Sequence, residues 1–320
     1  MQETDVCSIE YFEDEERFAD IVNMKVFSGE QFIQPEDIQE KNRSIFMKWG
    51  RNGRYKVRTL YRDIVRLVKM QMRVVLIALE NQDKIHYAMP VRVMTEDCGN
   101  YYEQWKKFLK FHKKKKDLRG AEFLSGISKY DKLIPVITIV VYFGKEPWDG
   151  PRSLKEMLDL SDLPECVRGM VVDYPIYLLE VRKIKNPEIF KSDFRWVVEF
   201  LQKEDDAQEV KRYLDENEEI FRNLDEDTYD LISIMSTSSQ LQNIKKECQT
   251  EEGGVDMCRA IQEMIDEGRE EGRKEGREEA EKFIFTVIRM HAKGMNVKEI
   301  SKECGVPRKR IKQILNELAA

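Results

Sequence analysis

The clearest pattern in the chain is a set of apolar runs in its first half. Val74 to Leu79 is entirely apolar, and a second run extends over 133–142. Runs of this length are typical of strands that are covered on both faces of a sheet. Residues 175–179 predict a further strand, and 85–88 predict an antiparallel strand after a short turn. Segment 60–68 is interpreted as a strand, although the spacing of its basic residues also fits a helix.

Helical spacing alternates with these strands. Residues 13–28 place apolar side chains on one face and stop at Gly29, which favours a helix end. Pro90 suits a first helical turn, so a long helix is expected over 91–113. Gly50 and Gly53 predict a turn before the first strand. Further helices are expected at 153–160, 194–202, 205–223 and 227–234.

The last third of the chain contains no strand pattern. Residues 236–254 are rich in Ser, Thr and Gln and are typical of a linker. A charged helix follows, with Gly268, Gly272 and Gly276 at every fourth position. Glycine disfavours a helix by about 1 kcal/mol relative to alanine, and Glu/Arg pairs partly offset this. The segment is either a solvated spacer or a surface for the close approach of a partner helix.

The C-terminal residues have the pattern of a helix-turn-helix. One apolar stripe precedes the turn at Gly305-Val306-Pro307 and a second follows it, and basic residues stand where the second helix begins. A helical hairpin for self-association, which would make the chain a homo-oligomer, is the alternative. The stripes are Val297, Ile300 and Cys304, then Ile311, Ile314, Leu315 and Leu318, and the basic residues include Arg308, Lys309 and Arg310.

Composition adds one feature to this picture. Charged residues make up 36% of the chain, above the usual quarter, and the formal net charge is −6. A net negative charge argues against a nucleic-acid partner, but local distribution matters more than the sum. Residues 106–116 contain seven lysines, ending in Lys113, Lys114, Lys115 and Lys116. A helix dipole favours cations at its C-terminus, yet seven exceed that need, so we expect a phosphate-backbone patch.

Two carboxylates stand at strand ends. Asp63 closes one apolar segment and Glu80 closes the run that ends at Leu79. A buried carboxylate without a partner is costly, and two such groups could share a divalent cation. The alternative is that both pair with Arg58, Arg62 or Arg92. The expected long helix carries Arg92, Tyr101 and Gln104 on one stripe, as phosphate contacts or as ordinary surface pairs.

Several ordered motifs in the first half of the chain resemble the Rpn group of recombination-promoting nucleases, also described as putative transposases, within the PD-(D/E)XK superfamily. They are Phe18-Ala19-Asp20, Arg62-Asp63, Glu80-Asn81-Gln82, Met89-Pro90-Val91-Arg92, Leu133-Ile134-Pro135-Val136-Ile137-Thr138, Tyr142-Phe143-Gly144 and Trp148-Asp149-Gly150-Pro151.

The resemblance implies a role for each residue of the expected site. Asp63 and Glu80 would be catalytic ligands of Mg²⁺, which neutralises phosphate charge and activates water. The Asn81 carbonyl would be a third ligand, and Asp20 would add a carboxylate near the metal. Gln82 would be the third catalytic residue, at the place where the superfamily has Lys. Glutamine can orient a water by hydrogen bonding, but it carries no positive charge that could stabilise developing negative charge.

The sequence therefore predicts an α/β protein with a restriction-endonuclease-like core, a mixed central sheet flanked by helices and an all-helical C-terminal region. The expected divisions are 1–185 for the core, 186–235 for a helical extension, 236–281 for linker and Gly-repeat helix, and 282–320 for the tail. We expect a Mg²⁺-dependent DNA endonuclease linked to recombination or transposition, or alternatively a catalytically silent DNA-binding or assembly protein.

Scattered cysteines, the absence of a signal-peptide pattern and the absence of a membrane-length apolar run predict a soluble, cytoplasmic protein without a membrane partner.

Overall fold

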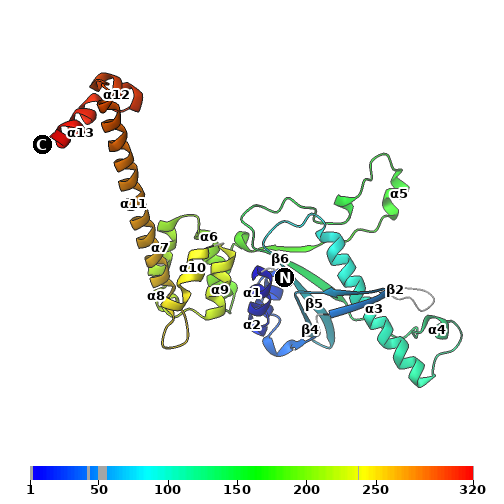
Figure 1. Ribbon diagram of the computed structural model, residues 1–320. Coiled ribbons are helices and arrows are strands. Elements are labelled where there is room, and N and C mark those ends of the chain that lie inside the picture. The colour runs from blue at the N-terminus through cyan, green and yellow to red at the C-terminus, as the bar shows by residue number, and fades with distance from the viewer. Residues whose placement is uncertain (1–2, 42–43, 50–55, 237, 320) are drawn as a thin grey trace. The chain divides into compact units, whose positions relative to one another are not determined.

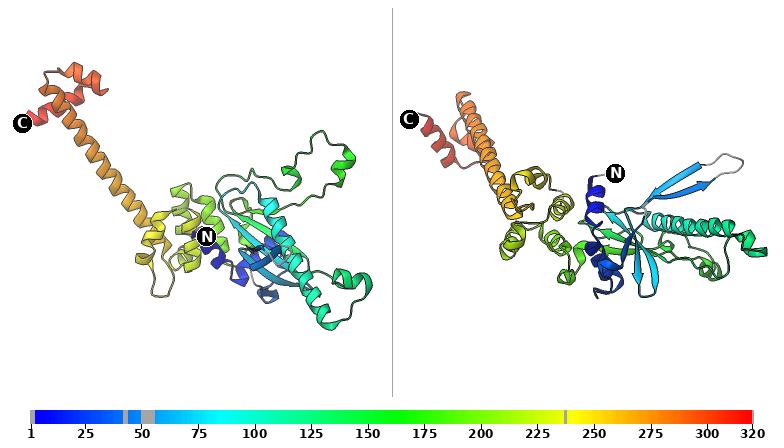
Figure 2. Two further views of the ribbon diagram at one scale, coloured as in Figure 1. Left: turned by 45° about the vertical axis from the view of Figure 1, so that its right-hand side comes forward. Right: turned by 90° about the horizontal axis from the view of Figure 1, so that it is seen from below.

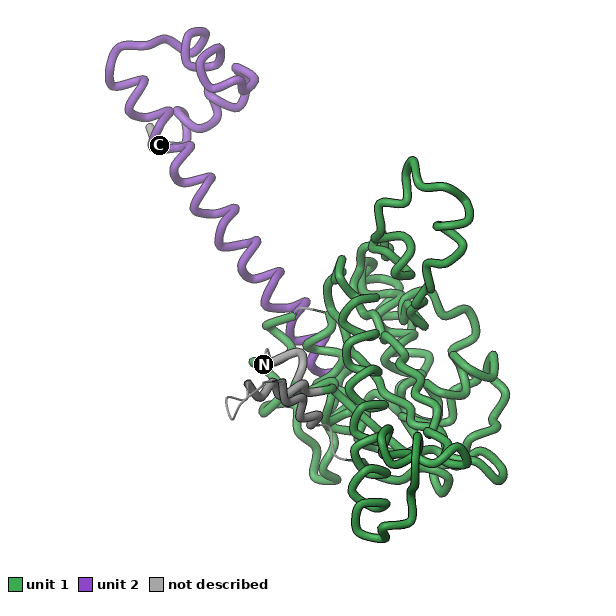
Figure 3. The backbone as a smooth tube through the Cα atoms, turned by 90° about the vertical axis from the view of Figure 1, so that its right-hand side faces the viewer, with its two compact units in different colours: residues 1–257 green, residues 258–320 purple. Residues whose placement is uncertain are grey.

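The computed structural model describes residues 3–41, 44–49, 56–236 and 238–319. The chain divides into two compact units, residues 1–257 and 258–320 (Figure 3). All strands lie in the first unit, and the second is helical. In the described residues, no helix combines the length and the apolar character that a membrane crossing requires.

A five-stranded mixed sheet forms the centre of the first unit (Figure 1). Its order is β1-β4-β5-β6-β7, antiparallel from β1 to β5 and parallel from β5 to β7. The expected mixed sheet is thus confirmed. The strands are β1 (Ile38–Glu40), β4 (Ile64–Met70), β5 (Arg73–Gln82), β6 (Val136–Tyr142) and β7 (Tyr177–Glu180); β2 (Ser44–Trp49) and β3 (Lys56–Tyr61) form a separate two-stranded sheet.

Helix α3 (Met89–Lys115) covers one face of the sheet. Side chains alternate between the faces of a strand, so Val140 and Tyr142 of β6 share a face. Both pack with Met89 and Val93 of α3 in one buried cluster. Pro90 lies in the first turn of the helix, as its sequence position predicts.

The opposite face is covered by the N-terminal helices and α6. Phe143, which follows β6 and continues its other face, contacts the rings of Phe12 and Phe194. Asp14 caps α2 by accepting hydrogen bonds from the N–H groups of Glu16 and Arg17. The two views of Figure 2 show the sheet between these layers. The helices are α1 (Glu3–Tyr11), α2 (Glu15–Val26) and α6 (Phe194–Lys203).

A group of helices completes the first unit. Residues 239–248 are helical, and Leu241 and Ile244 are buried, although the composition predicts a linker there. The segment is helical despite its Ser and Gln content because its apolar side chains, at helical spacing, are buried. The helices are α7 (Ala207–Glu216), α8 (Glu218–Phe221), α9 (Glu226–Met235) and α10 (Ser239–Ile244).

Three local predictions were wrong. Residues 85–88 form no strand, because the chain turns directly from β5 into α3. Segment 60–68 is not one strand: it is broken at Arg62-Asp63 between β3 and β4. The helix expected at 153–160 is reduced to the 3₁₀ turn η2 (Lys155–Met157). The turn expected at Gly50 and Gly53 lies outside the described residues.

Short elements join the main ones. They are α4 (Gly120–Ser125), α5 (Glu165–Met170), η1 (Pro35–Asp37), η3 (Val181–Lys183), η4 (Pro187–Ile189) and η5 (Lys245–Cys248).

The second unit contains two short helices joined by a turn, which both alternatives for the C-terminal residues predict. Ile300, Ile311 and Ile314 are buried together with Val287 in one apolar cluster. Gly305 ends α12 in the left-handed conformation, which glycine adopts without strain. The unit consists of α11 (Met257–Ala292, beginning at the end of the first unit), α12 (Val297–Cys304) and α13 (Arg308–Ala319).

Candidate active site

Asp63 and Glu80 meet where β4 begins and β5 ends. In the antiparallel ladder Ile64 faces Leu79, so the residue before one stands beside the residue after the other. The Asp63 carboxylate accepts a hydrogen bond of 2.8 Å from the backbone N–H of Asn81. The local fold of the two strands therefore fixes the position of Asp63 relative to Glu80.

Glu80 is fully buried and stands between two arginines. Its Oε2 lies 2.6 Å from Nη2 of Arg92, on the first turns of α3. Its Oε1 lies 3.7 Å from Nε of Arg62 and has no hydrogen-bond partner among the described residues. One oxygen of this carboxylate thus keeps the capacity to bind a further donor or a cation.

The electrostatic environment of Glu80 favours its neutral form. Burial raises its pKa well above the ordinary value, and the carboxylates of Glu96 and Asp63 raise it further. Arg92 and Arg62 act in the opposite direction. The pKa remains raised despite both arginines, so additional positive charge at this place would be stabilised.

A buried network on α3 supports Arg62. Nη2 of Arg62 lies 2.6 Å from Oδ1 of Asp97, and the same nitrogen donates to Oγ1 of Thr138. The hydroxyl groups of Thr138 and Tyr174 both donate to the Asp97 carboxylate. Partners from α3, β6 and the segment before β7 therefore fix the position of Arg62 next to Glu80.

The sequence interpretation missed Glu96 as well as Asp97. Glu96 is buried, 3.3 Å from Nε of Arg92 and 3.5 Å from Nε of Arg62. The signal available in the sequence was the four-residue spacing from Arg92 to Glu96, which places both on one helix face. No comparable signal linked Asp97 to Thr138 and Tyr174, which are distant in sequence.

Asn81 and Gln82 complete the end of β5. Gln82 donates from Nε2 to the Asn81 carbonyl at 2.6 Å, so both groups already have a partner. The Asn81 side chain is buried, and neither of its polar atoms has a hydrogen-bond partner in the described part of the chain. Strand alternation directs it to the face opposite Glu80. The backbone carbonyl alone is therefore the Asn81 group to consider at this site.

The donor set fits Mg²⁺ only as an incomplete site. Magnesium prefers oxygen ligands and is commonly held by one or two carboxylates, with waters and substrate phosphates completing its shell. Asp63 and Glu80 are such a pair, and Glu80 has an unpartnered oxygen. Among the described residues, no group of three or more His, Cys, Asp or Glu side chains could hold a metal ion. Waters and a substrate phosphate would therefore complete the shell.

Asp20 does not join this group. It is buried on α2, where its carboxylate accepts hydrogen bonds from the backbone N–H and the hydroxyl of Ser192 at 2.8 and 2.7 Å. The N–H of Lys191 adds a third bond at 3.2 Å. These bonds attach the segment before α6 to α2, and they account for Asp20 without a metal.

Arg92, Tyr101 and Gln104, which share one stripe of α3, have different partners. Arg92 reaches Glu80, whereas Tyr101 and Gln104 bind the backbone before and at the start of β6. The Tyr101 hydroxyl accepts a hydrogen bond from the N–H of Val136. Gln104 bonds both the N–H and the carbonyl of Ile134. Tyr101 and Gln104 thus position β6 against α3, which is the ordinary pairing that the sequence left open.

The lysine run lies at the C-terminal end of α3. Lys113, Lys114, Lys115 and Lys116 are all exposed. Lys116 ends the helix in the left-handed conformation, with φ of 55°. Near it, His112 contacts Asp117 at 2.7 Å and Asp131 at 2.8 Å through its two ring nitrogens. This contact closes the segment that carries α4 back onto α3.

We expect the stability contribution of His112 to depend on pH. Its hydrogen bonds to Asp117 and then Asp131 raise its pKa above the value of about 6.5 in an unfolded chain. The contribution is therefore complete below pH ~6.5 and is lost as the pH rises through the folded-state pKa. The measurement is the thermal midpoint, followed by tryptophan fluorescence, to which Trp105 contributes from this region through the hydrogen bond of its indole to the Ser125 carbonyl.

The control for this prediction is His112→Gln, which cannot acquire a proton. The difference in midpoint between the native chain and the variant should shrink between pH 6 and pH 8. A difference that stays constant over this interval would contradict the role of His112 charge.

The basic residues of the tail are placed as expected. Arg308, Lys309 and Arg310 begin α13 and are exposed. Their apolar neighbours face the cluster of the second unit, so the basic side chains remain on its surface.

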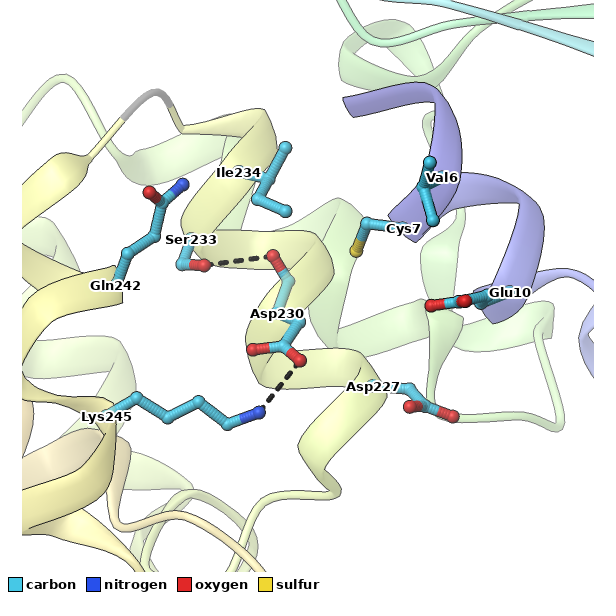
Figure 4. Close-up of a pocket in the computed structure, with 9 residues that line it drawn as sticks. All are labelled: Val6, Cys7, Glu10, Asp227, Asp230, Ser233, Ile234, Gln242 and Lys245. Carbon is cyan, nitrogen blue, oxygen red and sulfur yellow. Dashed lines mark hydrogen bonds and ion pairs between the residues drawn. The ribbon is translucent and has the colours of Figure 1, made fainter. Parts of the chain in front are cut away.

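A separate cavity of about 300 Å³ lies between α1 and α9 (Figure 4). Two of its three acidic residues are already paired: Asp230 binds Lys245 at 2.8 Å, and Asp227 binds Arg17 at 3.3 Å, whereas Glu10 is the third. Burial, aided by these carboxylates, raises the pKa of Cys7 to about 12. The thiol is therefore protonated near neutral pH and is a poor nucleophile.

Comparison with known proteins yields one match. Residues 110–231 match the family model described as "Putative transposase, YhgA-like". This match agrees with the resemblance found in the sequence. The matched part contains Lys113 to Lys116, β6, β7, helices α6 to α8 and the first part of α9, whereas Asp63, Glu80 and Arg92 precede it. No curated protein and no solved structure matches the chain.

Proposed function

We propose that this chain, similar over residues 110–231 to the YhgA-like putative transposases, is a Mg²⁺-dependent DNA endonuclease that acts in recombination or transposition. The observation that supports this most is the meeting of Asp63 and Glu80 at one end of the sheet. The pair comes from adjacent strands, and the raised pKa of Glu80 marks a place where added positive charge is favourable.

Each residue of the candidate site would have its own role in the reaction. Asp63 and the free Oε1 of Glu80 would hold Mg²⁺, with the Asn81 carbonyl beside them. When bound, the ion supplies charge neutralisation on the phosphate and activation of a water. Gln82, half-buried at the end of β5, would orient that water through its amide. Arg92, partly exposed, would contact the phosphate with its planar fork.

A catalytically silent DNA-binding or assembly protein is the second candidate. One observation favours it: Arg62 and Arg92 already neutralise Glu80, and Gln82 replaces the lysine of the superfamily pattern. In this case the same residues would only hold the fold together, and no divalent ion would be required.

Incubation of the full chain with supercoiled plasmid separates the two candidates. The endonuclease should convert the plasmid to nicked or linear forms with Mg²⁺ and not with EDTA. DNA binding that is equal in both buffers, without conversion of the plasmid, would support the silent protein.

The lysine run should contribute sequence-independent affinity for DNA. Replacement of Lys113, Lys114, Lys115 and Lys116 by Gln should weaken binding equally for unrelated DNA sequences. Each lost phosphate contact should reduce the slope of log affinity against log salt by about 0.9. The measurement is fluorescence anisotropy at several salt concentrations, and an unchanged slope would show that these lysines are only a solvated helix end.

A further inference from the structure

A groove of about 380 Å³ lies under the C-terminal half of α3, on the same sheet face as Glu80. Leu67 of β4 and Leu76 of β5 line it, together with Ile134, which precedes β6. Phe108 and Phe111 line it from the helix. Phe111 is 50% exposed, so a large apolar ring remains accessible to a ligand.

The charged residues of this groove are all cationic. Lys41, Lys107 and Lys132 line it, and no acidic side chain is among its described lining residues. Burial lowers the pKa of Lys41 to about 8, and an anionic ligand would favour the charged form of this lysine. The ammonium group of Lys115 lies 4.4 Å from the centre of the Phe111 ring, next to the groove. The surface thus offers apolar rings and positive charge together.

This combination discriminates between ligands. A DNA duplex could use the lysines, but its bases are stacked on one another and have no free face for a phenylalanine ring. An unpaired base has such a face, and aromatic side chains with a basic groove are the usual platform for single strands. The apolar lining is therefore used only if the strand is unpaired.

We propose that the groove lined by Phe108, Phe111, Lys41, Lys107 and Lys132 binds an unpaired stretch of DNA. A base lies against the Phe111 ring, and the adjacent phosphates contact the lysines. The inference rests on the proposed function, and it specifies the substrate as DNA with a single-stranded segment beside the cleavage point. From Glu96 to Phe108 the helix rises about 18 Å, so the groove follows α3 away from the candidate site.

Equilibrium binding of the full chain in EDTA tests the inference without cleavage. The probes are a labelled 20-nucleotide oligothymidylate and a labelled 20-base-pair duplex, followed by anisotropy. Phe111→Ala should weaken oligothymidylate binding roughly 5- to 100-fold, and duplex binding less than twofold. The half-exposed position makes unfolding of this variant unexpected, and circular dichroism checks it.

The matched control is Phe285→Ala on α11, where the ring is 67% exposed but lies outside the groove. It should change neither affinity. A second variant, Phe111→Trp, provides a direct signal, because stacking of a base should quench the added indole fluorescence. This quenching should appear with oligothymidylate and not with the duplex.

The other outcomes are distinguishable. Equal losses for both probes in Phe111→Ala would overturn the inference in favour of a phosphate surface. Quenching of Phe111→Trp by polyglutamate, and not by oligothymidylate, would overturn it in favour of an acidic peptide. A native chain that cuts duplex plasmid but does not bind oligothymidylate would overturn the inference and leave the proposed function standing. Selective loss in Phe111→Ala without any plasmid cleavage by the native chain would support the groove and contradict the endonuclease.

Discussion

Asp63→Asn should reduce Mg²⁺-dependent plasmid nicking at least about 100-fold while leaving the fold intact. The asparagine oxygen can still accept the hydrogen bond from the Asn81 N–H, so the strand ends remain joined. What is lost is the negative charge that would hold the ion, a deficit of about 3 kcal/mol or more in transition-state stabilisation. The measurement is the initial rate of conversion of supercoiled DNA.

Asp205→Asn is a suitable control, because this carboxylate is 83% exposed and pairs only with Lys145 at the surface. It should retain the native nicking rate. A rate for Asp63→Asn within about threefold of the native rate would contradict the metal role. Glu80→Ala is a less direct test, since it would remove one buried partner from both Arg62 and Arg92 and would therefore also destabilise the site.

Arg62→Met should lower the free energy of unfolding of the first unit by about 3–5 kcal/mol. The Arg62 side chain has no exposed surface, and it neutralises Asp97 directly with Glu80 and Glu96 close by. Its removal leaves buried carboxylates with less compensation. The loss should be smaller at pH 5 than at pH 8, because carboxylates deprived of the guanidinium take up protons more readily.

Urea denaturation followed by tryptophan fluorescence measures this loss, since all four tryptophans lie in the first unit. The matched control is Arg152→Met, whose guanidinium is about half exposed and pairs with Glu180 at 2.9 Å. A surface pair of this kind contributes less than about 1 kcal/mol. Similar losses for the two variants would show that the buried network adds no specific stability.

The sequence predicted the parts of the fold that depend on local pattern. The apolar runs of β5 and β6 have more consecutive apolar residues than a strand with one exposed face, so both strands could be predicted as buried. Pro90 predicted the start of α3. The failures depended on tertiary contacts. Leu241 and Ile244 are buried only because other helices of the first unit surround them, and their polar neighbours concealed this. At 85–88 the strand expectation failed because α3 begins immediately afterwards.

The residues of the candidate site also differ in how far local pattern places them. Asp63 was expected to close an apolar segment, but it stands directly before β4. It lies beside Glu80 because the start of β4 pairs with the end of β5 in the antiparallel ladder. Asp20 could not be assigned from sequence, because its partner Ser192 lies far along the chain. Tyr101 and Gln104 share the helix stripe of Arg92, but periodicity alone cannot tell which neighbour a stripe meets. That neighbour is the backbone around the start of β6.

The salt bridge between Arg92 and Glu80 has a consequence for ion uptake. A guanidinium on Glu80 acts as an internal counterion, so the chain keeps this carboxylate neutralised before any divalent ion arrives. Binding of Mg²⁺ at Oε1 would place a second cation beside this ion pair, and the apparent affinity for the ion would be reduced accordingly. A DNA phosphate that attracts Arg92 would release Glu80 at the same moment. Ion and substrate would then bind with positive cooperativity, each increasing the affinity for the other.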